Sequence, residues 1–178
     1  RVSVADPATD ASANILGTLN LLEAVRTAVH RPRFVFSSTG GAVYGDLDPP
    51  PSVETSQKNP ESPYGIAKLS VEYYLGYYGR VNGLETVALR YANVSGPRQD
   101  PHGEAGVVAI FCQRLLEGRS LTVFGTGEQT RDYGFVGDVA AANVLAAKAT
   151  VPPASRYRLA SRAELSARGT VPSLSPWT

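Results

Sequence analysis

Hydrophobic residues recur at helical spacing over residues 14–29, and an unbroken apolar segment follows them. Ile15, Leu19 and Leu22 stand three or four positions apart, which is the spacing of one apolar face of a helix. Residues 33–38, RFVFSS, favour a strand and end in small hydroxyl side chains. A short run of this kind is typical of a buried strand in a parallel sheet. The pattern therefore predicts a helix over 14–29 and a strand over 33–38.

The next part of the chain repeats the order of helix and strand. Residues 46–63 are rich in proline and polar residues, which indicates a long surface loop. Ser62 is a favourable N-cap and Pro63 a favourable first helical residue, so a helix should begin there and end near Gly79. Its apolar face consists of Ala67, Val71, Tyr74, Leu75 and Tyr78. Residues 85–97, ETVALRYANVSGP, then predict a β-branched strand broken by a Gly-Pro pair.

The order strand, helix, strand is typical of a doubly wound parallel sheet, which belongs to the α/β class. After this sheet the pattern changes. It predicts a helix over 107–117, a strand over 121–125 and an alanine-rich helix capped by Asp138. Ligands of doubly wound sheets bind beyond the carboxyl ends of the strands. Here residues 37–39 and 91–93 stand at those ends, so we expect hydroxyl and amide groups to converge there.

Composition narrows the class of protein further. The formal net charge is only +1 at pH 7, which excludes a strongly basic surface for nucleic acid or membrane. The one cysteine, Cys112, excludes an internal disulfide and a cysteine-based metal cluster. The sequence contains neither a signal peptide nor a long apolar span. We therefore expect a cytoplasmic protein that binds no metal, no nucleic acid and no membrane.

A tyrosine and a lysine stand four residues apart at the start of the helix predicted from Ser62. Four residues make about one turn, so Tyr64 and Lys68 should lie on the same side of that helix. An unperturbed tyrosine has a pKa of about 10, too high for a general base near neutrality. An ammonium ~4 Å away favours the phenolate by ~4 kcal/mol at an effective dielectric of ~20, before the cost of burial. The pair therefore predicts a general base. The alternative is an ordinary boundary tyrosine beside a lysine whose charge reaches solvent.

Five blocks of sequence occur in a fixed order: SVADP with NILGTLNLLEA, FVFSSTGGAVYG, SPYGIAKLSVE, LRYANVSGPRQDP and LTVFGTGEQTRDYGFVGDVAAA. They cover about residues 3–148 and resemble the extended short-chain dehydrogenase/reductases, within them the NAD-dependent sugar-nucleotide epimerase/dehydratase family. The resemblance implies that residues 1–98 are the carboxyl-terminal part of a Rossmann-like NAD-binding domain with the catalytic tyrosine and lysine. Residues 99–150 would be part of a smaller nucleotide-sugar-binding region, and residues 151–178 an atypical tail, disordered or truncated.

The resemblance also implies roles for single residues. Tyr64 would be the catalytic base, and Lys68 would bind the nicotinamide ribose of NAD and lower the tyrosine pKa. Thr39 resembles the hydroxyl partner of the reacting sugar oxygen, with Ser38 as the alternative because the motif has one extra glycine. Eight further positions match family contacts to cofactor or substrate. They are Asn14 in the helix that supports the site, Tyr91 and Ala92 beside the nicotinamide, Asn93 at the diphosphate, Arg131 as the phosphate clamp, and Thr122, Val123 and Phe124 along the uracil.

Three of these matched residues also have a purely structural interpretation. Asn14 would be a helix cap, Thr39 a turn residue, and Arg131 a surface partner of Asp132. Their joint occurrence in the order of the family favours the functional interpretation.

By resemblance, the reaction is the 4-epimerisation of a UDP-sugar, of the UDP-glucose and UDP-galactose type. The tyrosinate takes the proton of the sugar 4-hydroxyl while hydride passes to NAD, and the 4-keto intermediate turns over before the hydride returns. Family dehydratases usually carry an Asp-Glu pair where this chain has Gly40 and Gly41, which favours an epimerase over a dehydratase or decarboxylase. The resemblance further implies a homodimer, paired through the tyrosine helix and the helix at 14–29.

One family feature does not occur in this sequence. The family opens with a glycine-rich turn that holds the NAD pyrophosphate, but the 178 residues contain no GxxGxxG or GxGxxG motif. We therefore expect a fragment that lacks the first half of the Rossmann sheet. The alternative is a non-catalytic remnant that keeps the motifs but cannot hold NAD.

Overall fold

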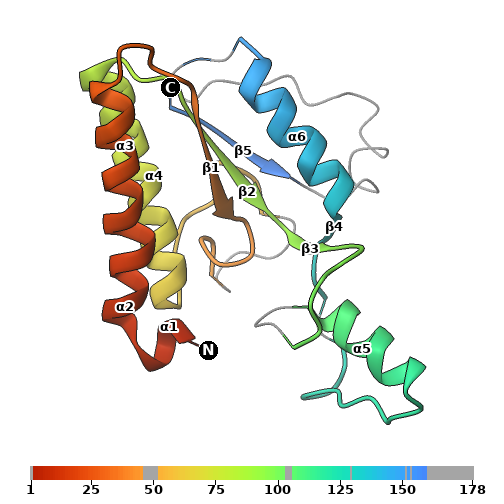
Figure 1. Ribbon diagram of the computed structural model, residues 1–178. Coiled ribbons are helices and arrows are strands. Elements are labelled where there is room, and N and C mark those ends of the chain that lie inside the picture. Colours follow the sequence, from red (N-terminus) through yellow and green to blue (C-terminus); the bar gives the residue numbers. More distant parts are fainter. Residues whose placement is uncertain are drawn as a thin grey trace.

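Three parallel strands form the central sheet of the chain (Figure 1). The computed structural model describes residues 2–45, 52–102, 106–128, 130–150, 152 and 154–159. The strands are β1 (Phe34–Thr39), β2 (Thr86–Tyr91) and β5 (Ser155–Leu159), and β2 lies in the middle. The predicted parallel α/β architecture is therefore confirmed.

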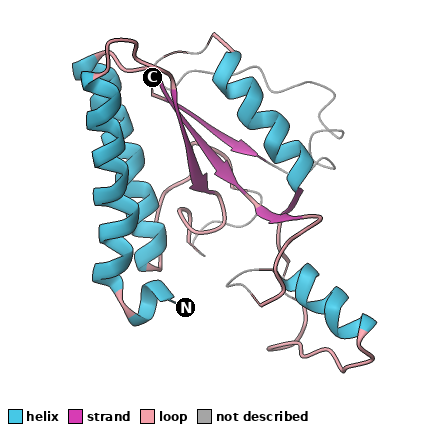
Figure 2. Ribbon diagram, in the orientation of Figure 1, coloured by secondary structure: helices cyan, strands magenta, loops and turns pink. Residues whose placement is uncertain are grey.

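Helices cover both faces of this sheet, as Figure 2 shows. On one face lie α3 (Gly17–Thr27) and α4 (Pro63–Asn82), and on the other lies α6 (Val136–Lys148). The core on the first face consists of Leu22, Phe36, Val71, Leu75, Tyr78, Leu84 and Ala88, whereas Val87, Leu89 and Ala146 form the core on the second. Successive residues of β2 thus point to opposite faces, as strand geometry requires, and both faces are apolar because both are covered.

The remaining elements lie before and beside the central sheet. Two short helices, α1 (Val2–Ala5) and α2 (Pro7–Ala11), lead into a π-helical turn, η1 (Ser12–Leu16), which continues directly into α3. A second sheet consists of β3 (Asn93–Ser95) and β4 (Tyr133–Phe135), which pair in parallel. Between these two strands the chain forms α5 (Val107–Leu116), which projects away from the central sheet (Figure 1). No helix in the described ranges is both long and apolar enough to cross a membrane.

Elements whose ends are determined locally agree with the sequence prediction. The hydroxyl of Ser62 accepts a hydrogen bond from the Gly65 amide at 3.1 Å, so Ser62 caps α4 as predicted. The helix ends three residues later than expected, at Asn82, because Gly83 adopts the left-handed conformation with a φ of 67°. The predicted strand at 33–38 is β1, shifted by one residue.

Four predictions were wrong or incomplete. The strand predicted over 85–97 divides at Ala92, and its second part, β3, joins the other sheet. Residues 121–125 form no strand, because no strand within the described ranges pairs with them. Phe135 rather than Asp138 is the N-cap of α6, and Asp138 lies in its first turn. The expected irregular tail contains β5, whereas its residues 160–178 lie outside the described residues.

The core between α3, α4 and the sheet leads to a prediction about stability. Leu22 is fully buried, so Leu22→Ala should lower the free energy of unfolding by about 3 kcal/mol through lost apolar contact and a residual cavity. Leu116, at the end of α5, is 89% exposed, and Leu116→Ala should change it by less than about 0.5 kcal/mol. Urea denaturation of both variants measures the difference. Equal losses would contradict this description of the core.

Candidate active site

The first turn of α4 lies against the loop that follows β1. A Cβ atom on Gly65 would come within 2.6 Å of the Ala42 carbonyl oxygen, so only glycine permits this close approach. One turn further along α4, the ammonium of Lys68 lies 4.8 Å from the ring centre of Phe36 in β1. The carboxyl end of β1 and the start of α4 therefore form one packed corner.

Tyr64 and Lys68 meet at this corner. The Lys68 ammonium lies 5.5 Å from the centre of the Tyr64 ring, and the predicted placement of both residues on one side of the helix is confirmed. Tyr64 is 37% exposed, so its phenol can be reached from solvent. The ammonium contacts two aromatic rings, a favourable arrangement for a partly buried cation.

Burial determines the titration of both groups. It raises the pKa of the Tyr64 phenol, and the negative charge of Asp10 acts in the same direction. It lowers the pKa of the Lys68 ammonium, and Asp10 opposes that change. Burial and Asp10 are thus the influences that raise the pKa of Tyr64 in this structure, and the lowering of that pKa by Lys68 stays a prediction.

Asp10 was not identified from the sequence, although it stands one turn before Asn14. The Asn14 side-chain amide donates to the Asp10 carbonyl at 3.2 Å and to its Oδ1 at 3.1 Å. Within the described residues, the buried Oδ2 of Asp10 has no hydrogen-bond partner. Asn14 lies inside the π-helical turn η1, so it is no helix cap, and such turns are frequent at functional sites. The four-residue spacing of Asp10 and Asn14 is the signal that could have revealed this contact.

The structure distinguishes the two candidate hydroxyls at the end of β1. Ser38 is buried, and its Oγ donates to Glu72 Oε1 at 2.6 Å. Thr39 is half-buried and ends β1 opposite Tyr91. Across the described residues its hydroxyl makes no hydrogen bond, so Thr39 is the better placed of the two to contact a ligand.

The side chain of Tyr91 points to the α6 face of the sheet, away from α4. Its hydroxyl shares a hydrogen bond of 3.0 Å with Ser37 and donates to Asn143 Oδ1 of α6 at 2.8 Å. The side chain thereby joins β1, β2 and α6, and the structure does not bring it into contact with Tyr64. Ala92 connects β2 to β3 and is half-buried.

Two of the expected diphosphate contacts come close together. Asn93 donates to the Asp132 carbonyl from its backbone amide at 2.9 Å and from its side chain at 3.2 Å. The Asp132 carboxylate pairs with Arg158 at 2.9 Å. Arg131 is exposed and donates to the Thr130 carbonyl. Arg131 thus directly precedes the residue that Asn93 contacts, and its guanidinium has no ion-pair partner in the part of the chain described.

The residues expected to line the uracil lie in the connection between α5 and β4. Thr122 accepts a hydrogen bond from Arg114 at 3.2 Å, and Val123 and Phe124 are 56% and 76% exposed. Nothing in the structure brings these three residues to Tyr64. The described ranges also contain no group of three His, Cys, Asp or Glu residues able to hold a metal ion.

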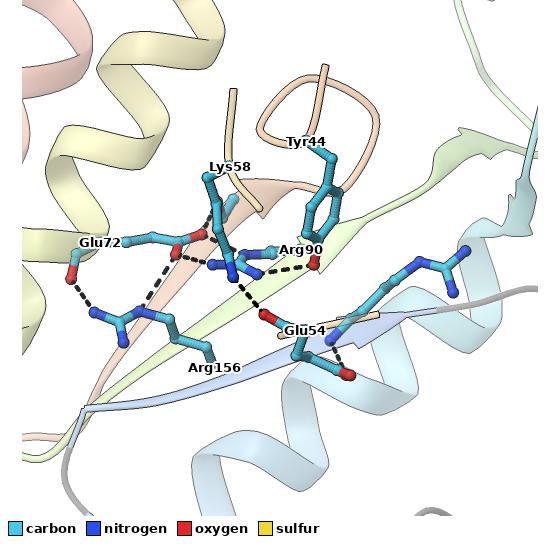
Figure 3. A network of polar contacts seen from close by, with 8 residues as sticks. Tyr44, Glu54, Lys58, Glu72, Arg90 and Arg156 are labelled. Atoms are coloured by element: carbon cyan, nitrogen blue, oxygen red, sulfur yellow. Dashed lines mark hydrogen bonds and ion pairs between the residues drawn. The ribbon is translucent and has the colours of Figure 1, made fainter. Parts of the chain in front are cut away.

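A buried set of charged residues behind the corner was also missed from the sequence. We define the Glu72 cluster as Glu72, Arg90, Arg156 and Ser38, which lies between α4 and the central sheet (Figure 3). Glu72 follows Tyr64 by eight residues, and Arg90 interrupts the apolar run of β2. A charge inside an apolar strand is the signal that could have indicated this cluster.

The position of Asp10 generates a prediction for the titration of the site. Its charge disfavours the phenolate of Tyr64 and favours the ammonium of Lys68, so Asp10→Asn should lower the pKa of both groups. NMR titration of ¹³C-labelled tyrosine and lysine side chains measures both shifts. Asp100→Asn, in an exposed loop, is the control and should change neither. A rise of either pKa in Asp10→Asn would contradict the assignment.

Comparisons with family models and with curated proteins point to the same family. The model of the NAD dependent epimerase/dehydratase family matches residues 1–160. A UDP-glucose 4-epimerase from Mycolicibacterium smegmatis is 50% identical over 144 residues, which are 81% of this chain and 46% of the relative. The chain thus spans about half the length of the curated relatives it matches.

Similar solved structures that were compared belong to the same family. UDP-glucose 4-epimerase from Thermotoga maritima, determined with UDP-glucose, has a TM-score of 0.81 and 48% identity, and the match covers 89% of this chain and 51% of that one. The Thermus thermophilus UDP-glucose 4-epimerase, in complex with NAD, has a TM-score of 0.79 and 48% identity, with 89% and 52% covered. The chain therefore belongs to the NAD-dependent epimerase/dehydratase family.

Proposed function

We propose that this chain carries the catalytic and sugar-nucleotide-binding residues of a UDP-sugar 4-epimerase of the UDP-glucose and UDP-galactose type. The observation that carries this proposal is the contact of Tyr64 with Lys68 at the carboxyl end of β1. The identity of about half of the matched residues to a UDP-glucose 4-epimerase supports the choice of substrate.

In this proposal Tyr64 takes the proton of the sugar 4-hydroxyl and returns a proton when the sugar is reduced. Thr39, at the end of β1, donates a hydrogen bond to the same sugar oxygen. The adjacent Gly40 and Gly41 place no carboxylate beside Thr39, which supports an epimerase over a dehydratase. Asn14, in the π-helical turn, keeps Asp10 near the tyrosine and lysine.

The residues of this chain fit the nicotinamide half of NAD. Lys68 and the Tyr64 hydroxyl are donors of the kind that hold ribose hydroxyls, and they stand at the edge of the sheet where such ligands bind. We assign Tyr91 and Ala92 to the same nicotinamide side, through the backbone at the end of β2. The sequence offers no glycine-rich turn for the pyrophosphate. When bound in its oxidised form, NAD supplies the hydride acceptor and a positive ring charge.

The sugar nucleotide would lie across the second sheet. Arg131 can form two parallel hydrogen bonds to a diphosphate, and Asn93 adds an amide donor from the neighbouring strand. A bidentate clamp of this kind would hold the diphosphate while the sugar turns. Thr122, Val123 and Phe124 would contact the uracil from the α5–β4 connection.

We also propose that two copies pair through α3 and α4. Ile66, Tyr73, Tyr77 and Val81 are exposed at offsets of seven and four along α4, which places them in one stripe. Leu21 of α3 is exposed as well. Exposed apolar stripes of this kind support a helical interface with a second copy of the chain.

The role of Arg131 predicts a loss of nucleotide affinity. Arg131→Ala should weaken binding of UDP at least about tenfold, because a charge-assisted contact to the diphosphate is lost. Isothermal titration of the chain with UDP measures it. Arg119→Ala removes another arginine that is exposed and already paired with Glu117, so it should leave the affinity unchanged. Equal affinity of the Arg131 variant and the parent chain would contradict the clamp.

The role of Tyr64 predicts a loss of turnover without a loss of binding. The test joins this chain to the amino-terminal segment of the Mycolicibacterium relative and measures interconversion of UDP-glucose and UDP-galactose with NAD. Tyr64→Phe should reduce turnover by at least about a hundredfold, because the proton acceptor is missing, and should leave UDP affinity intact. Tyr74→Phe, a half-exposed tyrosine of the same helix, is the matched control. Full activity of Tyr64→Phe would overturn the base assignment.

A further inference from the structure

The carboxylate of Glu72 joins α4 to all three strands of the central sheet. It accepts a hydrogen bond from Ser38 of β1 at 2.6 Å, and from Arg90 of β2 at 2.9 and 2.6 Å. An ion pair of 3.3 Å joins it to Arg156 of β5. Figure 3 shows Arg90 and Arg156 approaching Glu72 from the sheet. Glu72 is therefore held from three directions at once.

The arginines of the Glu72 cluster are themselves held. Arg90 also donates to the Tyr44 hydroxyl at 2.8 Å, in the loop that follows β1. Arg156 donates from its Nη2 to the backbone carbonyl of Glu72 at 3.0 Å. Both the side chain and the backbone of this helical residue are thus tied to the sheet, so α4 cannot slide at this position without breaking several contacts.

Tyr64, Lys68 and Glu72 follow one another at intervals of four residues along α4. Each interval turns the helix by about 40° beyond a full turn, so the three side chains share one side of α4 within about 80°. A rotation of α4 that displaced Glu72 would displace Tyr64 and Lys68 by the same angle. It would also leave Arg90, which is 1% exposed, as an unpaired buried charge.

Apolar packing alone would not define this rotation as sharply. Val71 and Leu75 anchor α4 in the core, but apolar contacts have no direction and tolerate small shifts. Hydrogen bonds to a buried carboxylate depend steeply on distance and angle. We propose that Glu72 is a positioning residue, which fixes the rotation of α4 and thereby holds Lys68 over Phe36 and beside Tyr64. This inference rests on the proposed function in that Tyr64 and Lys68 are its reacting pair.

The titration of Lys68 reports the position of the helix directly. The chain has three lysines, Lys58, Lys68 and Lys148, so ¹³C labelling at the lysine side chains gives a simple spectrum. Burial against the packed corner lowers the pKa of Lys68. A helix that rotates or loosens would expose this ammonium to water and return its pKa toward the ordinary value, whereas a change in stability alone would leave it unchanged in the folded chain.

The test is Glu72→Asp, which keeps the charge and withdraws the carboxylate by one methylene. We expect a folded chain, judged by circular dichroism, in which the Lys68 pKa rises toward the ordinary value of a lysine. The matched control is Glu85→Asp, which shortens the exposed partner of Arg33 by the same methylene and should leave Lys68 unchanged. An unchanged or lower Lys68 pKa in folded Glu72→Asp would overturn the proposal.

A second variant covers the case in which Glu72→Asp does not fold. Arg156→Lys keeps the charge at a partly exposed position and replaces the guanidinium that holds both the carboxylate and the carbonyl of Glu72 by a single ammonium. It should raise the Lys68 pKa in the same direction by a smaller amount, and no rise would overturn the proposal. Because neither titration requires turnover, failure here leaves the proposed epimerase activity standing, and failure of the Tyr64→Phe assay leaves the positioning role standing.

Discussion

The ion pair between Glu72 and Arg90 lies between the tyrosine helix and the sheet, and the geometry of the whole corner depends on it. Moving each of these charges out of water costs several kcal/mol, which their attraction offsets only when every remaining hydrogen-bonding position is filled. Here Ser38, Tyr44 and Arg156 fill those positions. A pair of this kind adds little net stability compared with apolar residues of the same size. It does define one arrangement of α4, because any other leaves a buried charge unpaired.

Desolvation also controls the chemistry at the corner. The same packing that holds Lys68 over Phe36 and Tyr64 disfavours its charge, and it disfavours the phenolate as well. Asp10 adds a negative charge nearby, which stabilises the ammonium but opposes the phenolate. In the proposed mechanism, a tyrosine base in this setting needs a further positive charge close to the phenol. An oxidised nicotinamide ring would supply that charge.

Sequence reasoning succeeded where structure is determined by neighbours in the chain. The start of α4 was predicted because Ser62, Pro63 and Gly65 act within a single turn. The strand at 121–125 was predicted wrongly because a β-prone run becomes a strand only when another strand pairs with it. For the same reason β5 was hidden in an expected irregular tail, since its partner β2 lies more than sixty residues earlier. Glu72 and Arg90 were missed because a pattern of polar and apolar residues assigns charged side chains to solvent, and nothing local shows that the two side chains neutralise each other.

In the proposed mechanism, one set of interactions positions Tyr64 and Lys68, and another activates Tyr64. Every contact described for Glu72 comes from within this chain, so the device that orients α4 is present in about half the length of the curated relatives. Burial and the charge of Asp10 both disfavour the phenolate of Tyr64, so a tyrosine base here needs a positive charge beside it. In the proposed mechanism, the folded corner would orient Tyr64, and the oxidised cofactor would add the positive charge that favours its phenolate. In that mechanism, an oriented but protonated Tyr64 would not react until a cofactor able to accept hydride is in place, which would couple proton transfer to the presence of the hydride acceptor.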